Sequence, residues 1–341
     1  MPNKIVRKKE SPTTSTLDTD TTNNQPKNAS KSRASNKHTK RTTKTDKISR
    51  NNLFNAIFDS LQPGAKSTKE NSRDQLIRNY MNQEISQHDI STNYNLLILY
   101  DEGTMLKSDA DYIYSAAASF QESKPILLVL YSGGGEIGSA YLIGQLCREY
   151  TKDKFIVTVP RQAKSSATLL CCAADEIHMG SLSELGPIDP QIEGMPALGL
   201  KASVTHICDL VKENPHASDM FSKYLHLSLD PVQLGYYERV AESAAQYAER
   251  LLEPHHKNLK QQPGKTAKLL VYSYKDHGFV IDKNEALQIF GAKTIMTNTD
   301  EYSLGNAIYE ELNYVSRVAH FLDHHFYIIG SLDSQLHFFK K

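Results

Sequence analysis

From residue 95 onward, short apolar runs alternate with stretches of helical periodicity. The apolar runs cover 96–100, 125–131, 155–159 and 176–179. The intervening segments, in which apolar or small residues recur at helical spacing, cover 108–122, 136–150 and 165–174. Strands that are apolar on both faces and alternate with helices are typical of a parallel sheet covered on both sides. The pattern therefore predicts an α/β fold.

The C-terminal half is predicted to be mostly helical around this sheet. Helical spacing recurs over 203–274, 282–290 and 301–321. Asp230, which is followed by a proline, is a favourable helix start. The end of the chain reads as a β-hairpin that turns near 330–333. We therefore expect a helical insertion after the strands of the sheet.

The N-terminal segment has a different texture. Residues 1–50 hold few apolar side chains among Thr, Ser, Asn and Lys, too few to offset the entropy of ordering the segment. We expect a disordered tail over 1–50 and a helical connector over 51–90. A single α/β domain would then occupy 91–341.

Charge is distributed unevenly between these parts. The whole chain has 39 Lys and Arg against 39 Asp and Glu. Residues 1–50 contain 13 basic and 4 acidic residues, so a basic tail precedes an acidic body. Such a tail is either a solvated tether or a contact for a polyanion such as nucleic acid or an acidic partner.

Membrane-spanning and exported classes are disfavoured. The longest strongly apolar run, 126–131, is far shorter than the roughly 20 residues that a membrane helix needs, so we expect no transmembrane segment. The start of the chain is basic but lacks the apolar stretch of a secretory signal. The four cysteines show no CxxC spacing, which fits reduced thiols and a cytoplasmic location.

Two turns between a strand and a helix carry candidate chemistry. Gly133, Gly134 and Gly135 follow the run 125–131, where backbone N–H groups can donate to an anion. This glycine run fits neither of the common nucleotide-binding motifs, and a purely structural turn is the alternative. Ser165 opens a helix directly after a strand; it is either a helix N-cap or an exposed nucleophile.

Together these turns resemble a known family. The order of strand, SGGG, helix, strand, AKSSA, apolar helix, DEI strand and GPIDPQ is similar to the Clp/crotonase superfamily, which includes ClpP and the signal-peptide peptidases. Within it, AKSSATLLCCAADEIHMGSLSELGPIDPQI resembles the serine dehydrogenase proteinase family most. The similarity is dense over 125–194 and loose over 275–295. It implies a ββα superhelix of the Clp/crotonase type and a serine peptidase.

The resemblance also implies the site. Ser165 falls on the position of the nucleophile, and Gly135 and Ser166 fall on the positions whose N–H groups form the oxyanion hole, with Gly134 the choice if the register slips by one. Asp189, in GPIDPQ, and His277, in KDHGFVIDKNEA, complete a triad in the chain order Ser–Asp–His. Chain order does not matter to a triad if the geometry is right.

A Ser–Lys dyad is the rival scheme. In the signal-peptide peptidases the Lys follows the Ser by roughly 40–50 residues, which by resemblance favours Lys212 over Lys201 as the alternative base. A catalytic Lys needs burial to lower its pKa, whereas Lys212 lies in a polar helix end. Lys164, next to the nucleophile, is expected to contact a substrate or a neighbouring subunit rather than to act as the base.

The expected function is a cytoplasmic serine peptidase that acts on a peptide or protein substrate. The resemblance implies a homo-oligomer. No cofactor is implied and no metal is expected, because His320, His324 and His325 lack the accompanying carboxylate of an HExxH motif. The alternative is an inactive Clp-fold scaffold or adaptor whose basic tail binds nucleic acid or an acidic partner.

Overall fold

The computed structural model describes residues 47–192, 194–228 and 230–341. The expectation of a disordered segment over 1–50 falls almost entirely on residues outside these ranges. No helix in the described part of the chain combines the length and the apolar composition needed to cross a membrane.

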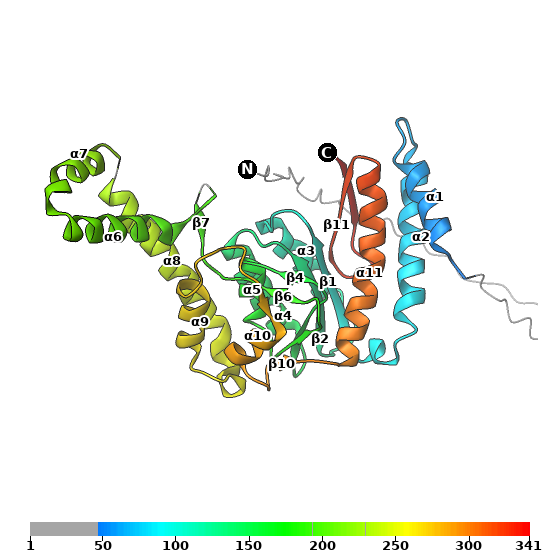
Figure 1. Cartoon of the computed structure of the whole chain (residues 1–341). Helices are drawn as coiled ribbons and strands as arrows, with labels where there is room; N and C mark the ends of the chain where they lie inside the picture. Colours follow the sequence, from blue (N-terminus) through cyan, green and yellow to red (C-terminus); the bar gives the residue numbers. More distant parts are fainter. Residues whose placement is uncertain (1–46, 193, 229) are drawn as a thin grey trace, which may run out of the picture.

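A central, mostly parallel sheet forms the middle layer (Figure 1). Its strands lie in the order β10-β5-β3-β2-β1-β11-β12. In that order they cover Ile295–Met296, Glu176–Met179, Phe155–Val159, Ile126–Ser132, Asn95–Asp101, His324–Gly330 and Leu336–Lys340. The strands from β10 to β1 run parallel, and the C-terminal hairpin β11–β12 adds antiparallel to β1. The predicted α/β class is confirmed.

Helices cover both faces of this sheet, as the doubly apolar strands require. On one face lie α3 (Lys107–Ala118), α4 (Ile137–Tyr150) and α5 (Ser166–Cys171), backed by α8 (Pro231–Leu252) and α9 (Pro263–Tyr272). The short helix α10 (Lys283–Phe290) packs its buried face into the same core. This face holds the larger of the two apolar cores and presents its strand-to-helix turns at one edge of the sheet.

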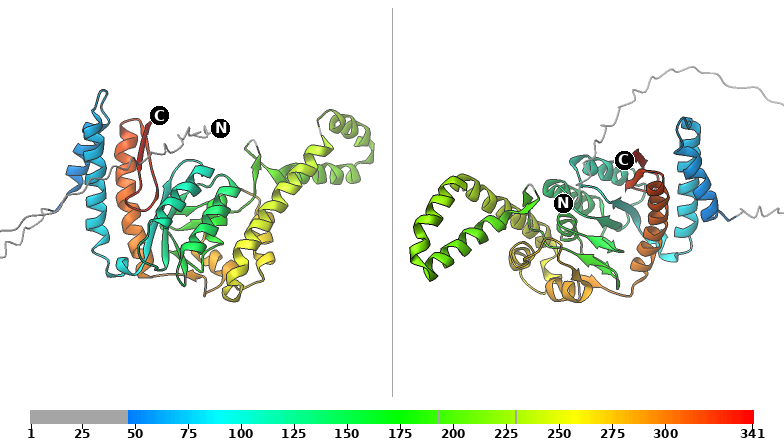
Figure 2. Two further views of the ribbon diagram at one scale, coloured as in Figure 1. Left: turned by 180° about the vertical axis from the view of Figure 1, so that it is seen from behind. Right: turned by 45° about the horizontal axis from the view of Figure 1, so that its top comes forward.

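The opposite face is covered by α11 (Asp300–Phe321), and outside it lie α1 (Arg50–Ser60) and α2 (Ser67–Ile85), as Figure 2 shows from two sides. Leu53, Ile57 and Ile77 are fully buried in the second core, which they share with α11 and the sheet. Residues 51–90 are helical as expected, but their apolar stripe is packed against the domain. These residues therefore form part of the folded domain, whereas the sequence favoured a connector.

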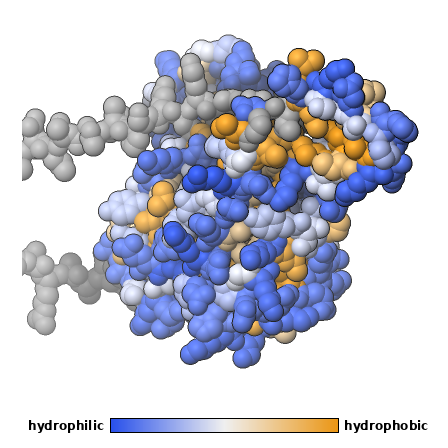
Figure 3. Space-filling model, turned by 90° about the vertical axis from the view of Figure 1, so that its left-hand side faces the viewer, coloured by the Kyte–Doolittle hydropathy of each residue, from blue (hydrophilic) through white to orange (hydrophobic). Residues whose placement is uncertain are grey.

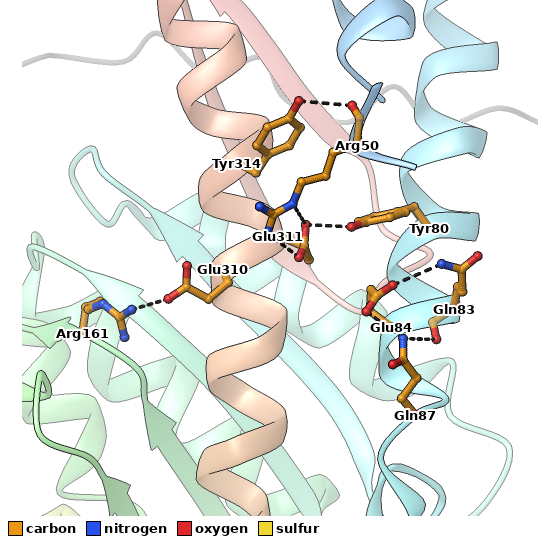
Figure 4. A network of polar contacts seen from close by, with 9 residues as sticks. All are labelled: Arg50, Tyr80, Gln83, Glu84, Gln87, Arg161, Glu310, Glu311 and Tyr314. Carbon is orange, nitrogen blue, oxygen red and sulfur yellow. Dashed lines mark hydrogen bonds and ion pairs between the residues drawn. The ribbon is translucent and has the colours of Figure 1, made fainter. Parts of the chain in front are cut away.

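Polar contacts fasten α1 and α2 to α11 (Figure 4). The guanidinium of Arg50 donates to both carboxylate oxygens of Glu311, at 3.1 and 2.7 Å. Tyr80 donates its hydroxyl to the same carboxylate at 3.0 Å, and Tyr314 donates to the carbonyl of Arg50 at 3.1 Å. Burial, followed by the charge of Glu311, raises the pKa of Tyr80 to about 12. The α1–α2 pair is thus held by both apolar and polar contacts.

An arm projects from the domain, formed by α6 (Ala197–Glu213), α7 (Ser218–Ser228) and the first turns of α8 (Figure 1). Asp230 caps α8 as predicted, accepting a hydrogen bond from the N–H of Val232 at 2.8 Å. Of the arm residues whose burial is described over 197–240, only Ala197 is buried. The arm therefore has little core of its own.

Candidate functional site

A side branch of the sheet gathers the segments that the sequence singled out. The two-residue strands β4 (Gln162–Ala163), β6 (Glu184–Leu185) and β9 (Ile281–Asp282) extend from the end of β2. The register places Ser132 beside Ala163, Ala163 beside Leu185, and Leu185 beside Ile281. Such short strands have no periodicity to read, and the sequence did not predict them.

The direction of these strands explains how the segments meet. β2, β4 and β6 are parallel and β9 is antiparallel to β6. Residues that follow the first three strands therefore emerge at the same edge as residues that precede β9. Gly135, Ser165 and Asp189 follow their strands, and His277 precedes β9. All four segments reach one edge although they are far apart in the sequence.

Ser165 occupies a strained backbone position at this edge. Its φ is +53° and its ψ is −120°. Among the described residues that are not glycine, the others with positive φ are Asp153, Asn298 and Asp323, and Asp and Asn tolerate this region best. The side chain of Ser165 accepts no capping hydrogen bond from α5, so the N-cap interpretation has no support. Strained residues of this kind cluster at functional sites.

The neighbouring serine is in a different environment. Ser166 is fully buried in the first turn of α5, and its Oγ has no hydrogen-bond partner among the described residues. Ser165 is half-buried. Of the two adjacent hydroxyls, that of Ser165 is the one that solvent reaches.

The glycine loop lies directly against the turn of Ser165. A Cβ on Gly134, whose φ is +95°, would lie 2.6 Å from the carbonyl oxygen of Lys164 and 2.9 Å from Cβ of Ser165. A Cβ on Gly135 would lie 2.4 Å from backbone atoms of Met105. Only glycine permits both approaches, because any side chain would clash with fixed backbone.

The N–H groups of these two turns differ in what they contact. The N–H of Gly134 donates to Oγ of Ser132 at 3.1 Å. Within the described part of the chain, the N–H groups of Gly135 and Ser166 have no recorded acceptor. A pair of unused donors beside a serine is the arrangement that an oxyanion hole requires. The contact of Gly134 favours Gly135 over it as the donor.

Asp189 and His277 form a hydrogen-bonded pair. Nδ1 of His277 lies 2.7 Å from Oδ1 of Asp189, whose side chain is only 9% exposed, against 33% for the imidazole. The other carboxylate oxygen of Asp189 accepts from Nε2 of Gln191 at 2.8 Å. Because a carboxylate only accepts, the contact requires a proton on Nδ1 of His277, and in a neutral imidazole Nε2 is then the nitrogen without a proton.

No hydrogen bond joins Oγ of Ser165 to His277 among the described residues. Catalytic hydrogen bonds are often long in the absence of substrate and tighten when substrate binds. The link between the two segments is Lys164. Its Nζ lies 3.2 Å from the carbonyl oxygen of Phe279, two residues beyond His277.

Lys164 makes contacts that the sequence did not predict. A contact with a substrate or a neighbouring subunit was expected, but its ammonium contacts its own chain, at the carbonyls of Leu185 and Phe279 and the carboxylate of Glu184. Its side chain is 15% exposed. The reason is the β4–β6 pairing, which places the stem of Lys164 over Gly186.

The alternative base Lys212 lies on the arm. Its side chain is 75% exposed and its Nζ is 2.8 Å from Oδ1 of Asp209. This ion pair raises the pKa of Lys212, whereas a general base needs a lowered one. Lys201 forms an ion pair with Glu238, which raises the pKa of Lys201. Neither lysine has the environment of a buried base.

The histidines near the C-terminus have other contacts. Nδ1 of His324 lies 2.6 Å from the carbonyl oxygen of Leu322, and His325 stacks on Phe339 with ring centroids 5.2 Å apart. Within the described ranges, no group of three or more His, Cys, Asp or Glu is arranged to hold a metal ion.

Two supporting residues escaped the sequence interpretation. Oγ1 of Thr168 donates to the carbonyl of Ala163 at 2.6 Å and accepts from the N–H of Gly186 at 3.0 Å. It thereby ties the turn of Ser165 to the loop that leads to Asp189. Gln191 orients the carboxylate of Asp189. The only sequence signal for either was its place inside AKSSAT or GPIDPQ.

Comparison with known sequences supports the family resemblance. Residues 95–219 match the profile of a family described as ClpP-like SDH-type serine proteinase. Two uncharacterized proteins of Methanocaldococcus jannaschii are similar: one is 32% identical over 96 residues, the other 35% identical over 92. These matches cover 28% and 27% of this chain and 33% and 31% of the relatives. The chain thus spans about a third of the length of these relatives.

Solved structures give weaker similarities. Two are mutants of a membrane-bound stomatin-specific protease, one of them in complex with a substrate peptide. Their sequence identities are 14% and 11%, and each has a TM-score of 0.37. They cover 65% and 73% of this chain, and 84% and 88% of their own. The arrangement of the site rests on the contacts within this chain.

Proposed function

We propose that this chain, whose residues 95–219 match the profile of the ClpP-like SDH-type serine proteinase family, is a serine peptidase with Ser165 as the nucleophile. The observation that carries this proposal is the hydrogen-bonded pair of Asp189 and His277. It lies at the same sheet edge as Ser165, which is half-buried and has a strained backbone. The family match supports peptide-bond hydrolysis as the reaction class.

Each residue has one task in the proposed reaction. His277, held by Asp189 through Nδ1, takes the proton of Ser165 on Nε2 as Ser165 attacks the peptide carbonyl. The N–H groups of Gly135 and Ser166 stabilise the oxyanion that forms. His277 then gives the proton to the leaving amine. In the second half of the reaction His277 takes a proton from water, the water attacks the acyl group, and His277 returns the proton to Ser165. The geometry requires Ser165 and His277 to approach when substrate binds.

A hydrolysis assay with matched serine variants tests this proposal. Wild type is expected to cleave fluorescein-labelled casein, and Ser165→Ala is expected to lose that activity. Ser166→Ala retains its backbone N–H and serves as the control, with activity close to wild type. Equal loss in both variants, or a fully active Ser165→Ala, would contradict the assignment.

The dyad and the scaffold make different predictions in the same assay. A Ser–Lys dyad would require Lys212→Met to be inactive. Because Lys212 is exposed and paired with Asp209, we expect Lys212→Met to keep its activity. An inactive scaffold or adaptor would leave casein intact in the wild type as well. His277→Ala separates the triad from the dyad, because only the triad loses activity on that change.

We also propose that the chain forms a homo-oligomer. The exposed apolar side chains of the arm support this. Met220, Leu227 and Val232 expose 61%, 85% and 79% of their surfaces, and Figure 3, which looks onto the arm end of the molecule, shows apolar surface gathered there. Exposed apolar patches of this kind are typical of interaction sites. Leu227→Glu is expected to lower the mass measured by light scattering, while Thr205→Glu, a polar position on α6, leaves it unchanged.

The cytoplasmic location and the role of the basic tail belong to the proposal too. Cys147, Cys171 and Cys172 are buried free thiols, which supports a reducing compartment. Cell fractionation tests the location. Binding of heparin, measured at two salt concentrations with and without residues 1–46, tests the polyanion contact, because binding through Lys and Arg weakens steeply as salt rises.

A further inference from the structure

Lys164 contacts the segments that carry all three proposed triad residues. It precedes Ser165 in the chain. Its Nζ lies 3.2 Å from the carbonyl oxygen of Leu185, on the strand that leads to Asp189, and 3.2 Å from that of Phe279, two residues beyond His277. The structure thus joins these segments through one side chain.

The contacts of Lys164 use its whole ammonium group. A lysine ammonium has three donors, and here they face two carbonyl oxygens and Oε2 of Glu184 at 3.1 Å. The side chain is 15% exposed, and of its bonds to carbonyl oxygens the one to Leu185 is partly buried and the one to Phe279 lies at the surface. These contacts direct Nζ of Lys164 to acceptors of its own chain.

The fold makes room for this lysine. A Cβ on Gly186 would lie 2.8 Å from Cδ of Lys164, so the absence of a side chain there lets the stem cross β6. The backbone of Lys164 is fixed as well: its N–H donates to the carbonyl of Ser132 at 3.0 Å, and its carbonyl accepts from Ala167 at 2.9 Å. The ammonium is therefore held from a rigid base.

The segment that carries His277 has few polar anchors of its own, and its ring contact is between Phe279 and Tyr274, with centroids 4.8 Å apart. It lies in a turn between α9 and β9, outside any helix or strand. The N–H groups of Gly278 and Phe279 bond back to Asp276 within that turn. The turn is tied to the rest of the site by the Asp189–His277 pair and by the bond from Lys164 to Phe279.

We infer that Lys164 is a positioning residue that ties the turn of His277 to the turn of Ser165. This inference rests on the proposed serine peptidase function. Removing the ammonium frees one side of the turn, and a displacement of about 1 Å in a catalytic group can slow a reaction about 10²-fold. The effect falls on the rate of the chemical step, because Lys164 is directed into the protein.

Active-site titration with a fluorophosphonate probe tests this inference in the full chain. In Lys164→Met the apolar stem is kept and the ammonium is lost. We expect the rate of labelling to fall about 10²-fold, with the same final labelled fraction as wild type. In peptide hydrolysis, kcat falls and KM stays. Lys164→Arg, which keeps a cation with several donors, is expected to recover part of the rate.

Lys283→Met is the matched control. Lys283 is a half-buried lysine beside β9 whose Nζ lies 3.5 Å from Oγ of Ser181, and its loss is expected to leave the labelling rate within twofold of wild type. A merely structural role of Lys164 would lower the labelled fraction and leave the rate of the folded molecules unchanged.

The outcomes separate the two proposals. A labelled wild type with an unslowed Lys164→Met, or a Lys283→Met slowed equally, overturns the positioning role alone. A wild type that is not labelled at Ser165 overturns both the positioning role and the proposed function.

Discussion

The backbone of Ser165 predicts that glycine is more stable than alanine at this position, whereas the reverse is expected at Ser166. The φ of +53° and ψ of −120° at Ser165 form a conformation in which a Cβ is strained, at a cost of about 1–3 kcal/mol. Glycine removes that strain but loses about 0.5–1 kcal/mol through the entropy of the unfolded chain. The net gain expected for Gly over Ala at this position is about 1 kcal/mol, or about 2 °C in Tm for a domain of this size.

Four variants isolate the backbone effect. Ser165→Ala, Ser165→Gly, Ser166→Ala and Ser166→Gly all lack the hydroxyl, so each Ala-to-Gly difference reports on the backbone. Ser166 has an ordinary helical position in the first turn of α5, where Gly is expected to be less stable than Ala by about 1 kcal/mol. Thermal unfolding followed by circular dichroism measures both differences.

The two differences must have opposite signs. If glycine destabilises the chain at 165 as much as at 166, the turn is not strained and the argument from the backbone fails. If glycine stabilises both positions, the effect does not belong to Ser165 alone, and the strain has been assigned to the wrong residue.

Three further predictions concern other parts of the molecule. Asp189→Asn is expected to lower kcat about 10⁴-fold, because the amide no longer selects the Nδ1–H tautomer of His277, and an activity near wild type would contradict the triad. Burial lowers the pKa of His255 from 6.5 to about 4. The folded state therefore binds fewer protons than the unfolded state between these values, and stability falls by about 3 kcal/mol as pH drops through this window. Urea unfolding of His255→Leu is expected to lack this loss, and an equal loss would exclude His255 as its source. Glu311→Ala is expected to cost about 1 kcal/mol because it leaves the largely buried hydroxyl of Tyr80 without its acceptor, whereas Asp59→Ala on exposed α1 surface changes stability little.

The strands and helices of the sheet were predictable because their apolar patterns are long. The strands predicted at 155–159 and 176–179 match β3 and β5, and the helix start predicted at Asp230 matches the N-cap of α8. In each case the apolar positions of the segment are spaced as the strand or helix buries them. The two-residue strands β4, β6 and β9 offered no pattern, since their pairing is decided by tertiary contacts.

The place of 51–90 was harder to infer. Its few apolar positions, among them Leu53, Ile57 and Ile77, lie among many polar residues, so the sequence favoured a connector. The structure buries these three side chains completely. Their partners lie more than two hundred residues away on α11, a pairing that the local sequence does not contain.

The candidate site was predicted through motifs rather than through periodicity. The resemblance in AKSSA and GPIDPQ indicated Ser165 and Asp189, and the structure places Asp189 in contact with His277. The contacts of Lys164 within its own chain were not predicted, because a single sequence does not reveal that β4 pairs with β6. The roles of Thr168 and Gln191 depend on the same tertiary contacts.

The most direct test of the central claim is the site at which a fluorophosphonate probe reacts. Wild-type protein is labelled with the probe, digested, and the modified peptide is sequenced by mass spectrometry. The account predicts one adduct on Ser165, its loss in Ser165→Ala and its retention in Ser166→Ala. An adduct on Ser166, or labelling that persists in Ser165→Ala, would contradict the account.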